Sequence, residues 1–208
     1  MPTRNVTKSA LLATAFSVYA MSQLTGVAFG AVPSAFERNT EHSQLRHVEA
    51  KFEQVGPEAE AVTYREGLVP LGASVRVVSA PSPVGTFTLL QVSGLESNRE
   101  YGAHVHTYPC GPEPDDAGPH FQHVPDPAQP SIDPAYANPR NEIWLDFTTD
   151  ARGGAISWSW VPWRIGDRPA GSVVIHDHHT RTGAGHAGDA GDRLACVDVP
   201  LGGDEQSG

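Results

Sequence analysis

The sequence predicts an all-β domain of the sandwich or barrel type, and three observations support this prediction. Short runs rich in β-branched residues recur after residue 60 and are separated by Gly and Pro. The 208 residues include 21 Gly and 18 Pro but only 18% charged residues, which is typical of a turn-rich globular domain rather than a helical bundle. Beyond the first thirty residues or so, the remaining length suits one domain with a hydrophobic core and is tight for two.

Residues 1–30 are expected to be an export signal. Arg4 and Lys8 precede an uncharged run that extends to Ala31, and Ala28-Phe29-Gly30 supplies small residues where a signal peptidase cleaves. An uncleaved membrane anchor is the alternative, because the run is long enough to cross a bilayer; its Ser, Thr and Gln residues make it rather polar for that. We therefore expect cleavage after Gly30 and a secreted protein, extracellular or in the cell envelope, with no stable membrane insertion after signal cleavage.

The rest of the chain divides into a tail, a domain and a second short tail. Residues 31–58 are polar and charged, which predicts a mobile N-terminal tail or linker, with a short helix around Gln44 to Phe52. The domain is expected at residues 59–201 and a C-terminal tail at residues 202–208. Eight strands are expected within the domain, at residues 61–64, 73–78, 86–92, 101–106, 142–147, 155–161, 172–176 and 194–199.

Two features of the domain stand out from the strand pattern. Trp158 and Trp160 alternate on one face of their strand, where we interpret them as packing residues. Between Thr107 and Arg140, nine prolines interrupt the pattern, and Pro cannot donate to a sheet ladder. This stretch is therefore expected to be an extended loop, and a loop of that length usually has a function.

Charge and cysteine content narrow the class of protein further. The chain has 14 Lys and Arg and 24 Asp and Glu, so its formal net charge at pH 7 is −10. Removal of residues 1–30, which contain two basic residues and no acidic one, leaves a net charge of −12. This balance argues against a nucleic-acid partner. Cys110 and Cys196 are most simply a disulfide in an oxidising compartment, with a metal thiolate pair or two free thiols as alternatives.

The histidines predict a metal site. Eight of the ten His follow residue 100, and His104 and His106 point to the same side of their strand, with the apolar Val105 on the other. His176 ends an apolar strand and His120 lies in a Gly-Pro loop, so three segments of the chain can bring imidazoles to one point. The alternative for any single His-x-His motif, such as His104 and His106, is a pair of exposed polar residues on a solvated face. Imidazole suits zinc, copper, iron and nickel, and of the first two only copper cycles between oxidation states.

At this point the motifs resemble the copper/zinc superoxide dismutase family, in its secreted bacterial type. The resemblance runs from about Ala61 to Val199 and rests on motifs in a fixed order: Val92-Ser93-Gly94-Leu95, Gly102-Ala103-His104-Val105-His106, Cys110, Gly118-Pro119-His120-Phe121, Val173-Val174-Ile175-His176 and Gly191-Asp192-Arg193-Leu194-Ala195-Cys196. It implies an eight-stranded Greek-key β-barrel with long loops. It also implies a superoxide dismutase in which copper is bound by His104, His106, His120 and His176, an intrachain disulfide joins Cys110 to Cys196, and Arg193 attracts superoxide.

The sequence also departs from that family at its zinc subsite. In that family, zinc is bound by the bridging His, matched here by His120, by two further His of the loop and by an Asp. In this sequence only His123 follows His120 in the loop, and it lies closer to His120 than the family's next ligand does. Thr180 also stands where the family has an Asp that links the ligands of the two metals. Copper is therefore the expected cofactor, and zinc is doubtful. Glu142 is the first candidate to hold the ring of His120 in place of zinc, with Asp126 behind it. The remaining histidines have no counterpart among the ligands and are expected to face solvent or form weak additional metal sites: His178, His179 and His186.

These observations lead to a ranked set of hypotheses. The first is a secreted superoxide dismutase in which the ring of His120 leaves the reduced metal, takes up a proton and gives it to the nascent peroxide. The second is a non-enzymatic copper-binding or buffering protein, against which Arg193 argues because a cation store gains nothing from a guanidinium nearby. The third is a structural zinc domain at His104, His106 and His176. The expected partner is the superoxide anion, and a homodimer is an assembly that the sequence leaves open.

Overall fold

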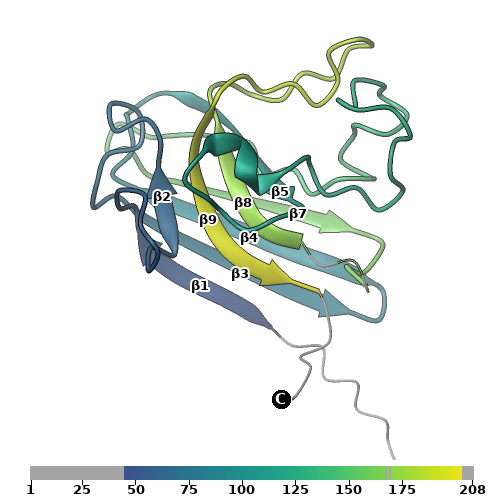
Figure 1. Ribbon diagram of the computed structural model, residues 1–208, viewed down its shortest axis with the longest axis horizontal. Coiled ribbons are helices and arrows are strands. Elements are labelled where there is room, and N and C mark those ends of the chain that lie inside the picture. The colour runs from purple at the N-terminus through teal and green to yellow at the C-terminus, as the bar shows by residue number, and fades with distance from the viewer. Residues whose placement is uncertain (1–44, 167, 169, 203–208) are drawn as a thin grey trace, which may run out of the picture. The chain divides into compact units, whose positions relative to one another are not determined.

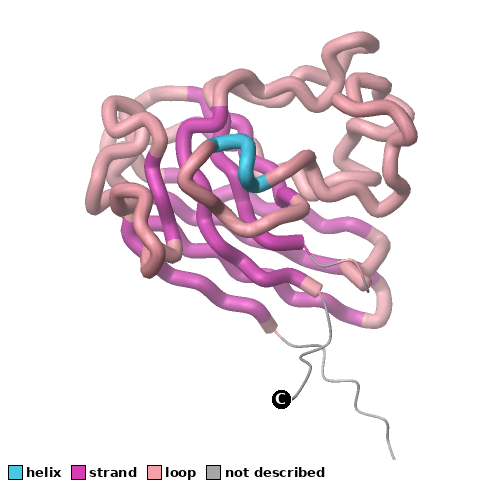
Figure 2. The backbone as a smooth tube through the Cα atoms, viewed as in Figure 1, coloured by secondary structure: helices cyan, strands magenta, loops and turns pink. Residues whose placement is uncertain are grey.

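The computed structural model describes residues 45–166, 168 and 170–202, which form two stacked antiparallel sheets (Figure 1). The elements within these residues are β1 (Arg46–Lys51), β2 (Ala61–Thr63), β3 (Ser74–Ser82), β4 (Gly85–Ser93), β5 (Glu100–His106), the 3-10 helix η1 (Pro114–Ala117), β6 (Phe147–Thr148), β7 (Ala155–Val161), β8 (Ala170–His176) and β9 (Arg193–Leu201). Figure 2 shows the longest loops gathered on one side of the strands. Over these residues, no helix is both long and apolar enough to span a bilayer.

The strand order is that of a Greek-key sandwich. One sheet has the order β1-β3-β4-β7, and the other has the order β2-β9-β8-β5-β6. Neighbours that are not consecutive in sequence, such as β4 with β7 and β5 with β8, are joined by crossovers between the layers. The prediction of an all-β Greek-key fold is therefore confirmed, with nine strands in the described residues rather than eight.

The additional strand corrects the expectation for residues 44–52. β1 pairs with β3 from Arg46 opposite Ser79 to Lys51 opposite Ser74, where a short helix within a polar tail was predicted. Val48 and Ala50 pack against the core and Phe52 is fully buried, while the charged residues between them face solvent. An edge strand needs only one apolar face, and three apolar residues among charged ones gave too weak a signal. The sheet therefore begins before residue 59, while residues 1–44 and 203–208 lie outside the described residues.

One other expected strand is shorter than predicted. Of residues 142–147, only Phe147 belongs to a strand, β6. The rest of the run is extended and makes isolated bridges, Trp144 with His104 and Glu142 with Gln122. This arrangement brings Glu142 towards the long loop instead of into a continuous sheet.

The core fills the space between the two sheets with alternating side chains. Val77 and Leu90 come from one sheet, Val105 and Val173 from the other, and all four are at most 1% exposed. Because Val105 points into this core, its neighbours on β5 must point to the opposite face of their sheet, beneath the loops. The core thus fixes the side of the molecule on which the histidines lie.

A disulfide attaches the long loop to the last strand. Cys110 and Cys196 are bonded and 86 residues apart in sequence, as predicted. Around them lies a small second apolar cluster that includes Val62, Ala117 and Val174. The backbone N–H of Cys110 also donates to Asp198 on β9, at 2.6 Å. The start of the loop is therefore held by a covalent bond, an apolar cluster and a hydrogen bond.

The two tryptophans of β7 are not packing residues. Trp158 is 65% exposed and Trp160 is 50% exposed, on the outward face of the four-stranded sheet. Their alternation on one face was read correctly, but alternation alone does not say which face is buried. The buried residues of this strand are Ser159 and Val161 instead, and Ala155 packs against the core.

Candidate metal centre

Four histidines from three segments meet beneath the loops. His104 and His106 lie on β5, His176 ends the neighbouring strand β8, and His120 lies in the loop after η1. An isolated antiparallel bridge between His106 and His120 brings the loop onto β5. One ring nitrogen from each of the four lies within 4.8 Å of the others. The structure thus brings together all four residues predicted as metal ligands.

Three of the rings use one nitrogen for a protein partner and leave the other for a metal. Nδ1 of His106 lies 2.9 Å from the carbonyl oxygen of Gly118, Nδ1 of His176 lies 3.3 Å from that of Gly191, and Nδ1 of His120 lies 2.8 Å from Oε2 of Glu142. Each of these acceptors holds a proton on Nδ1, so Nε2 carries the lone pair. The Nε2 atoms of His106 and His176 lie 3.2 Å apart.

His104 uses its nitrogens the other way round. Its Nε2 lies 2.6 Å from Oγ1 of Thr180, and its Nδ1 is buried without a hydrogen-bond partner. A buried polar atom without a partner is costly unless something occupies the site, and a metal ion satisfies a ring nitrogen. This orphaned Nδ1, with the three Nε2 atoms, forms an all-nitrogen donor set that fits a transition-metal ion.

The surroundings of three of the ligands, His104, His106 and His176, keep their rings neutral. Burial, followed by the neighbouring histidines, holds the pKa values of His104 and His106 well below the usual range. Burial and then His120 lower the pKa of His176 to about 3. Neutral imidazole is the form that binds metals, so the site is prepared for a cation at neutral pH.

Thr180 and Asp146 form a second layer behind His104. The hydroxyl of Thr180 accepts from Nε2 of His104 and donates to Oδ1 of Asp146 at 2.8 Å, while Oδ2 of Asp146 accepts from the Thr180 backbone N–H at 2.7 Å. Oδ1 also accepts from the backbone N–H of Ala103, at 3.1 Å. From the sequence, Thr180 was noted only because the related family has an Asp at this position, and Asp146 was given no role. Their contact could not be predicted, because residues 34 positions apart leave no local sequence pattern.

Glu142 contacts His120, whereas Asp126 does not. Glu142 is 1% exposed, and its Oε2 accepts from His120 and from Nε1 of Trp144 at 2.6 Å, while Oε1 accepts from Nε2 of Gln122 at 2.8 Å. Asp126 lies further along the same network, because it accepts from Ser131 at 2.7 Å, which in turn accepts from Gln122.

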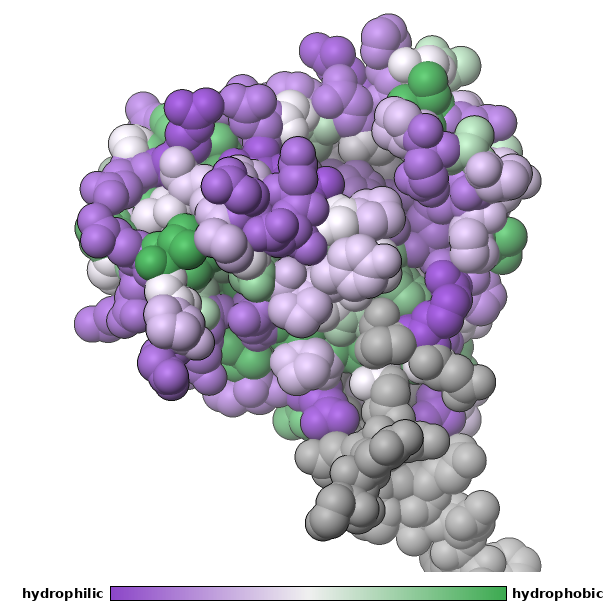
Figure 3. Space-filling model, viewed as in Figure 1, coloured by the Kyte–Doolittle hydropathy of each residue, from purple (hydrophilic) through white to green (hydrophobic). Residues whose placement is uncertain are grey.

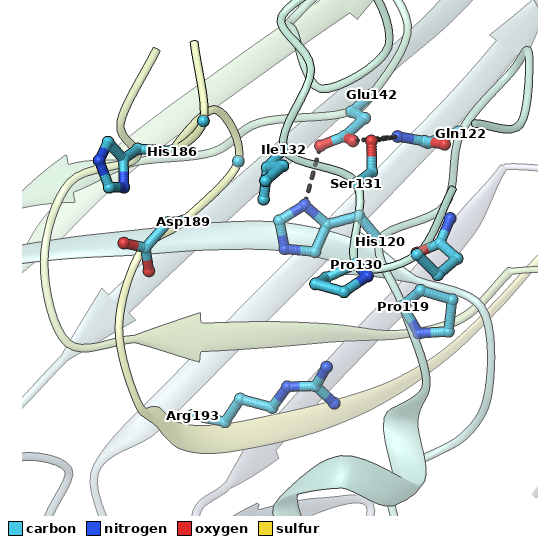
Figure 4. A pocket seen from close by; sticks show the side chains of 13 residues that line it. Pro119, His120, Gln122, Pro130, Ser131, Ile132, Glu142, His186, Asp189 and Arg193 are labelled. Atoms are coloured by element: carbon cyan, nitrogen blue, oxygen red, sulfur yellow. Dashed lines mark hydrogen bonds and ion pairs between the residues drawn. The ribbon is translucent and has the colours of Figure 1, made fainter. Parts of the chain in front are cut away.

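Arg193 begins β9 and is fixed by two loop carbonyls. Its Nη1 donates to Pro114 at 3.0 Å and its Nη2 to Gly118 at 2.8 Å, and its side chain is 19% exposed. The Gly118 oxygen therefore accepts from both Arg193 and His106. Arg193 and His120 line one cavity, which has a volume of about 490 Å³. Figure 4 shows both side chains there, together with those of Glu142, His186 and Asp189.

The other four histidines after residue 100 lie outside the cluster. His123 stacks on Trp163 with ring centroids 4.9 Å apart, and His186 is exposed at the cavity wall. Nδ1 of His178 lies 2.8 Å from the carbonyl oxygen of His179, whose own Nε2 is 3.0 Å from that of Phe147. Among the described residues, none of the four belongs to a metal-ligating group.

Fold and site together define a disulfide-closed Greek-key β-sandwich protein with a four-histidine centre able to hold a metal ion. No protein-family model matches the chain, and a comparison with curated proteins finds no match either.

Among solved structures, the chain resembles the Cu/Zn superoxide dismutase from Brucella abortus, with 19% identity, 73% of this chain and 98% of that chain covered, and a TM-score of 0.48. It also resembles a double mutant of a SOD-like protein from Bacillus subtilis, with 15% identity, coverage of 76% and 96%, and a TM-score of 0.48. At these scores the function has to be argued from the residues of the site.

Proposed function

We propose that the protein is a secreted superoxide dismutase that binds copper through His104, His106, His120 and His176. The observation that carries this proposal is the joint placement of a four-imidazole cluster and a fixed guanidinium at one cavity. A metal store needs the first of these and gains nothing from the second. An enzyme acting on a small anion needs both.

Copper is the metal whose chemistry suits this site. When bound, it supplies two oxidation states, so that one superoxide is oxidised to oxygen and a second, with two protons, is reduced to hydrogen peroxide. The donor set contains four imidazoles and no carboxylate among the ligand atoms. Both cysteines are in the disulfide, so the thiolates common in structural zinc sites are not available in the described residues.

Arg193 attracts and orients the substrate. The chain carries a net charge of −10, which repels an anion at long range, so a local positive charge at the cavity is needed to bring superoxide in. Two of the guanidinium nitrogens are anchored on the carbonyls of Pro114 and Gly118. These bonds fix its plane, and further N–H groups remain for the anion.

His120 delivers a proton to the product. Its Nδ1–H is held by Glu142, so a proton taken up during turnover goes to Nε2. The negative charge of Glu142 stabilises the imidazolium until Nε2 donates to the nascent peroxide. Glu142 thereby takes the positioning role that zinc has in the family, and no zinc is required.

One observation favours a copper-binding or buffering protein as the second candidate. Oδ1 of the exposed Asp115 lies 3.7 Å from Nε of Arg193, which reduces the positive field at the cavity. Because Asp115 is 96% exposed, water and salt screen this effect strongly. We therefore keep the enzyme as the first proposal.

Pulse radiolysis of superoxide decay tests the proposal on copper-loaded, zinc-free protein with its disulfide intact. We expect rapid turnover with one copper per chain, and a decrease of about tenfold or more in Arg193→Ala. Arg152→Ala is the matched control, because it removes the same charge from an exposed turn between β6 and β7. Tightly bound copper without turnover would instead identify a copper-binding protein, and tightly bound zinc in place of copper would identify a structural domain.

A further inference from the structure

One ring of the four-histidine cluster can be reached from a cavity. His104 and His106 are fully buried and His176 is 4% exposed, whereas the side chain of His120 is 17% exposed. Within the described residues Arg193 borders two cavities, and of these the one of about 490 Å³ has a member of the cluster, His120, on its wall. This cavity therefore provides a route by which a metal ion reaches the orphaned Nδ1 of His104.

A fifth imidazole lies on the wall of this cavity. His186 is exposed and lines the cavity together with His120, but it does not belong to the four-histidine group. Figure 4 shows its ring on the loop that also carries Asp189. In the described part of the chain, no group forms a hydrogen bond with this ring. A neutral imidazole always has one nitrogen with a free lone pair, so His186 offers the cavity a ligand atom that no other group uses.

The turn that carries His186 is held close to His120. The backbone N–H of Gly185 donates to the carbonyl oxygen of Ile132, at 3.1 Å, and this bond attaches the turn to the long loop. Gly188 has a φ of 81°, which glycine adopts without steric cost. A methyl group added at Gly188 would lie 3.8 Å from Nδ1 of His120. The turn therefore packs against the ring of His120, and its backbone is fixed while the ring of His186 is not.

Asp189 supplies a second donor on the same turn. Its backbone N–H donates to the carbonyl oxygen of His186, at 3.1 Å, and residues joined in this way have Cα atoms within about 7 Å. Its carboxylate accepts from Nη1 of Arg181 and from the backbone N–H of Gly191, both at 3.0 Å. Each carboxylate oxygen keeps a further lone pair. One imidazole and one carboxylate can bind a metal ion briefly, but they are too few to retain it against four buried imidazoles.

The charges around the cavity give such a ligand a task. The net charge of −10 draws cations to the protein, and hydrophilic side chains cover most of the loops at the top of Figure 3. At short range, however, the guanidinium of Arg193 on the cavity wall repels a cation. An imidazole binds copper through a lone pair and carries no charge, so His186 can hold the ion in the cavity despite this repulsion.

We propose that His186, assisted by Asp189, is the entry ligand through which copper reaches the four-histidine cluster. An ion bound at His186 is already in the cavity, so its transfer to His120 is intramolecular and does not depend on the copper concentration in solution. The transfer exchanges one imidazole ligand for another and involves no change of oxidation state. The inference rests on copper as the metal of the proposed function, but it does not require turnover of superoxide.

Stopped-flow loading of the full exported protein, metal-free and with its disulfide intact, tests this entry site. Cu(II) is supplied as its glycine complex at pH 7.5, and the visible absorption of imidazole-bound Cu(II) reports the loading rate. In the native protein we expect this rate to saturate as the copper concentration rises. In His186→Ala, and in His186→Gln, which keeps the size of the side chain, it should be about tenfold lower and should rise linearly.

Two further measurements separate entry from final binding. The equilibrium affinity for copper, measured by competition with a chelator, should be the same in the native protein and in both variants. His47→Ala is the matched control, since its side chain is 43% exposed on β1 and does not line the cavity, and it should load at the native rate.

Three results would overturn the proposal. An unchanged loading rate in His186→Ala would show that copper enters without this ring. A loss of equilibrium affinity in proportion to the rate would make His186 a permanent ligand rather than an entry ligand. An equal decrease in His47→Ala would mean that exposed histidines capture copper wherever they lie. Because no superoxide is used, these results are independent of whether the loaded protein is a dismutase.

Discussion

The hydroxyl of Thr180 lies 2.6 Å from Nε2 of His104 and has only one proton, which it donates to Asp146. The contact with His104 must therefore be an N–H donated to the hydroxyl oxygen. This assigns the tautomer of His104 with its proton on Nε2 and its lone pair on the buried Nδ1. Two residues that do not touch the metal position thus decide which nitrogen of His104 can bind it.

Replacing Thr180 tests this assignment. In Thr180→Val the acceptor is lost, so the Nε2–H tautomer is no longer favoured and copper affinity should fall about 10- to 100-fold. Thr180→Ser keeps the hydroxyl and should bind copper as the native protein does. Affinities are measured by competition with a chelator at pH 7, and equal affinities in all three proteins would show that another contact sets the tautomer.

Glu142 is expected to affect turnover more than copper binding. Glu142→Gln keeps the size of the side chain but removes the charge that stabilises protonated His120, so superoxide turnover at pH 7 should fall about tenfold while one copper is retained. Asp126→Asn changes a buried carboxylate of the same network that does not touch His120 and should have a much smaller effect. Metal analysis and pulse radiolysis give the two quantities, and a loss of copper in parallel with activity would contradict the proton role.

The metal-free protein should lose stability as the pH falls below about 6.5. The pKa values of His104, His106 and His176 are lowered by folding, so the unfolded chain binds protons that the folded chain does not. Folding is therefore favoured above the unfolded pKa, and the advantage is lost on acidification, by roughly 3 kcal/mol between pH 6.5 and 5.5 for the three groups.

Urea unfolding in the presence of a chelator measures this loss. The control range is pH 7.5 to 8.5, where these three histidines are neutral in both states and make no contribution to a pH dependence. Equal free energies of unfolding at pH 6.5 and 5.5 would mean that the buried imidazoles accept protons in the folded protein.

Removing the disulfide should destabilise the fold and weaken the substrate site. The bond closes a segment of 86 residues, so Cys110→Ser combined with Cys196→Ser should lower the free energy of unfolding by about 4 kcal/mol. The loop that starts at Cys110 also carries Pro114 and Gly118, which anchor Arg193. Superoxide turnover should therefore decrease, while the copper content is largely kept because three of the four ligands lie on β5 and β8. Unchanged turnover would show that the loop holds Arg193 in place without the disulfide.

The sequence predicted most strands and the four-histidine cluster for identifiable reasons. Alternating apolar residues marked β3, β4 and β5, and the spacing of His104 and His106 placed both rings on one face. β1 was missed because only one of its faces is buried, so its charged residues resembled those of a tail.

Contacts across the fold could not be predicted in the same way. Which face of β7 is buried depends on the layer packed against it, so Trp158 and Trp160 were placed wrongly. Glu142 could be nominated by its place in the loop, but two of its three donors, His120 and Gln122, come from a separate segment that only the folded chain brings to it. The contact of Thr180 with Asp146 is of the same kind.

The position of β1 determines where a recombinant version of this protein should start. A fragment starting at residue 59, where the sequence pattern places the domain, would lack the strand that covers β3 and would leave the backbone groups of β3 unpaired. Such an edge can pair with other chains, and the missing Phe52, Val48 and Ala50 would also leave a void in the core. Aggregation of a fragment trimmed in this way would reflect a cut made through the sandwich, and a usable expression boundary lies before Arg46.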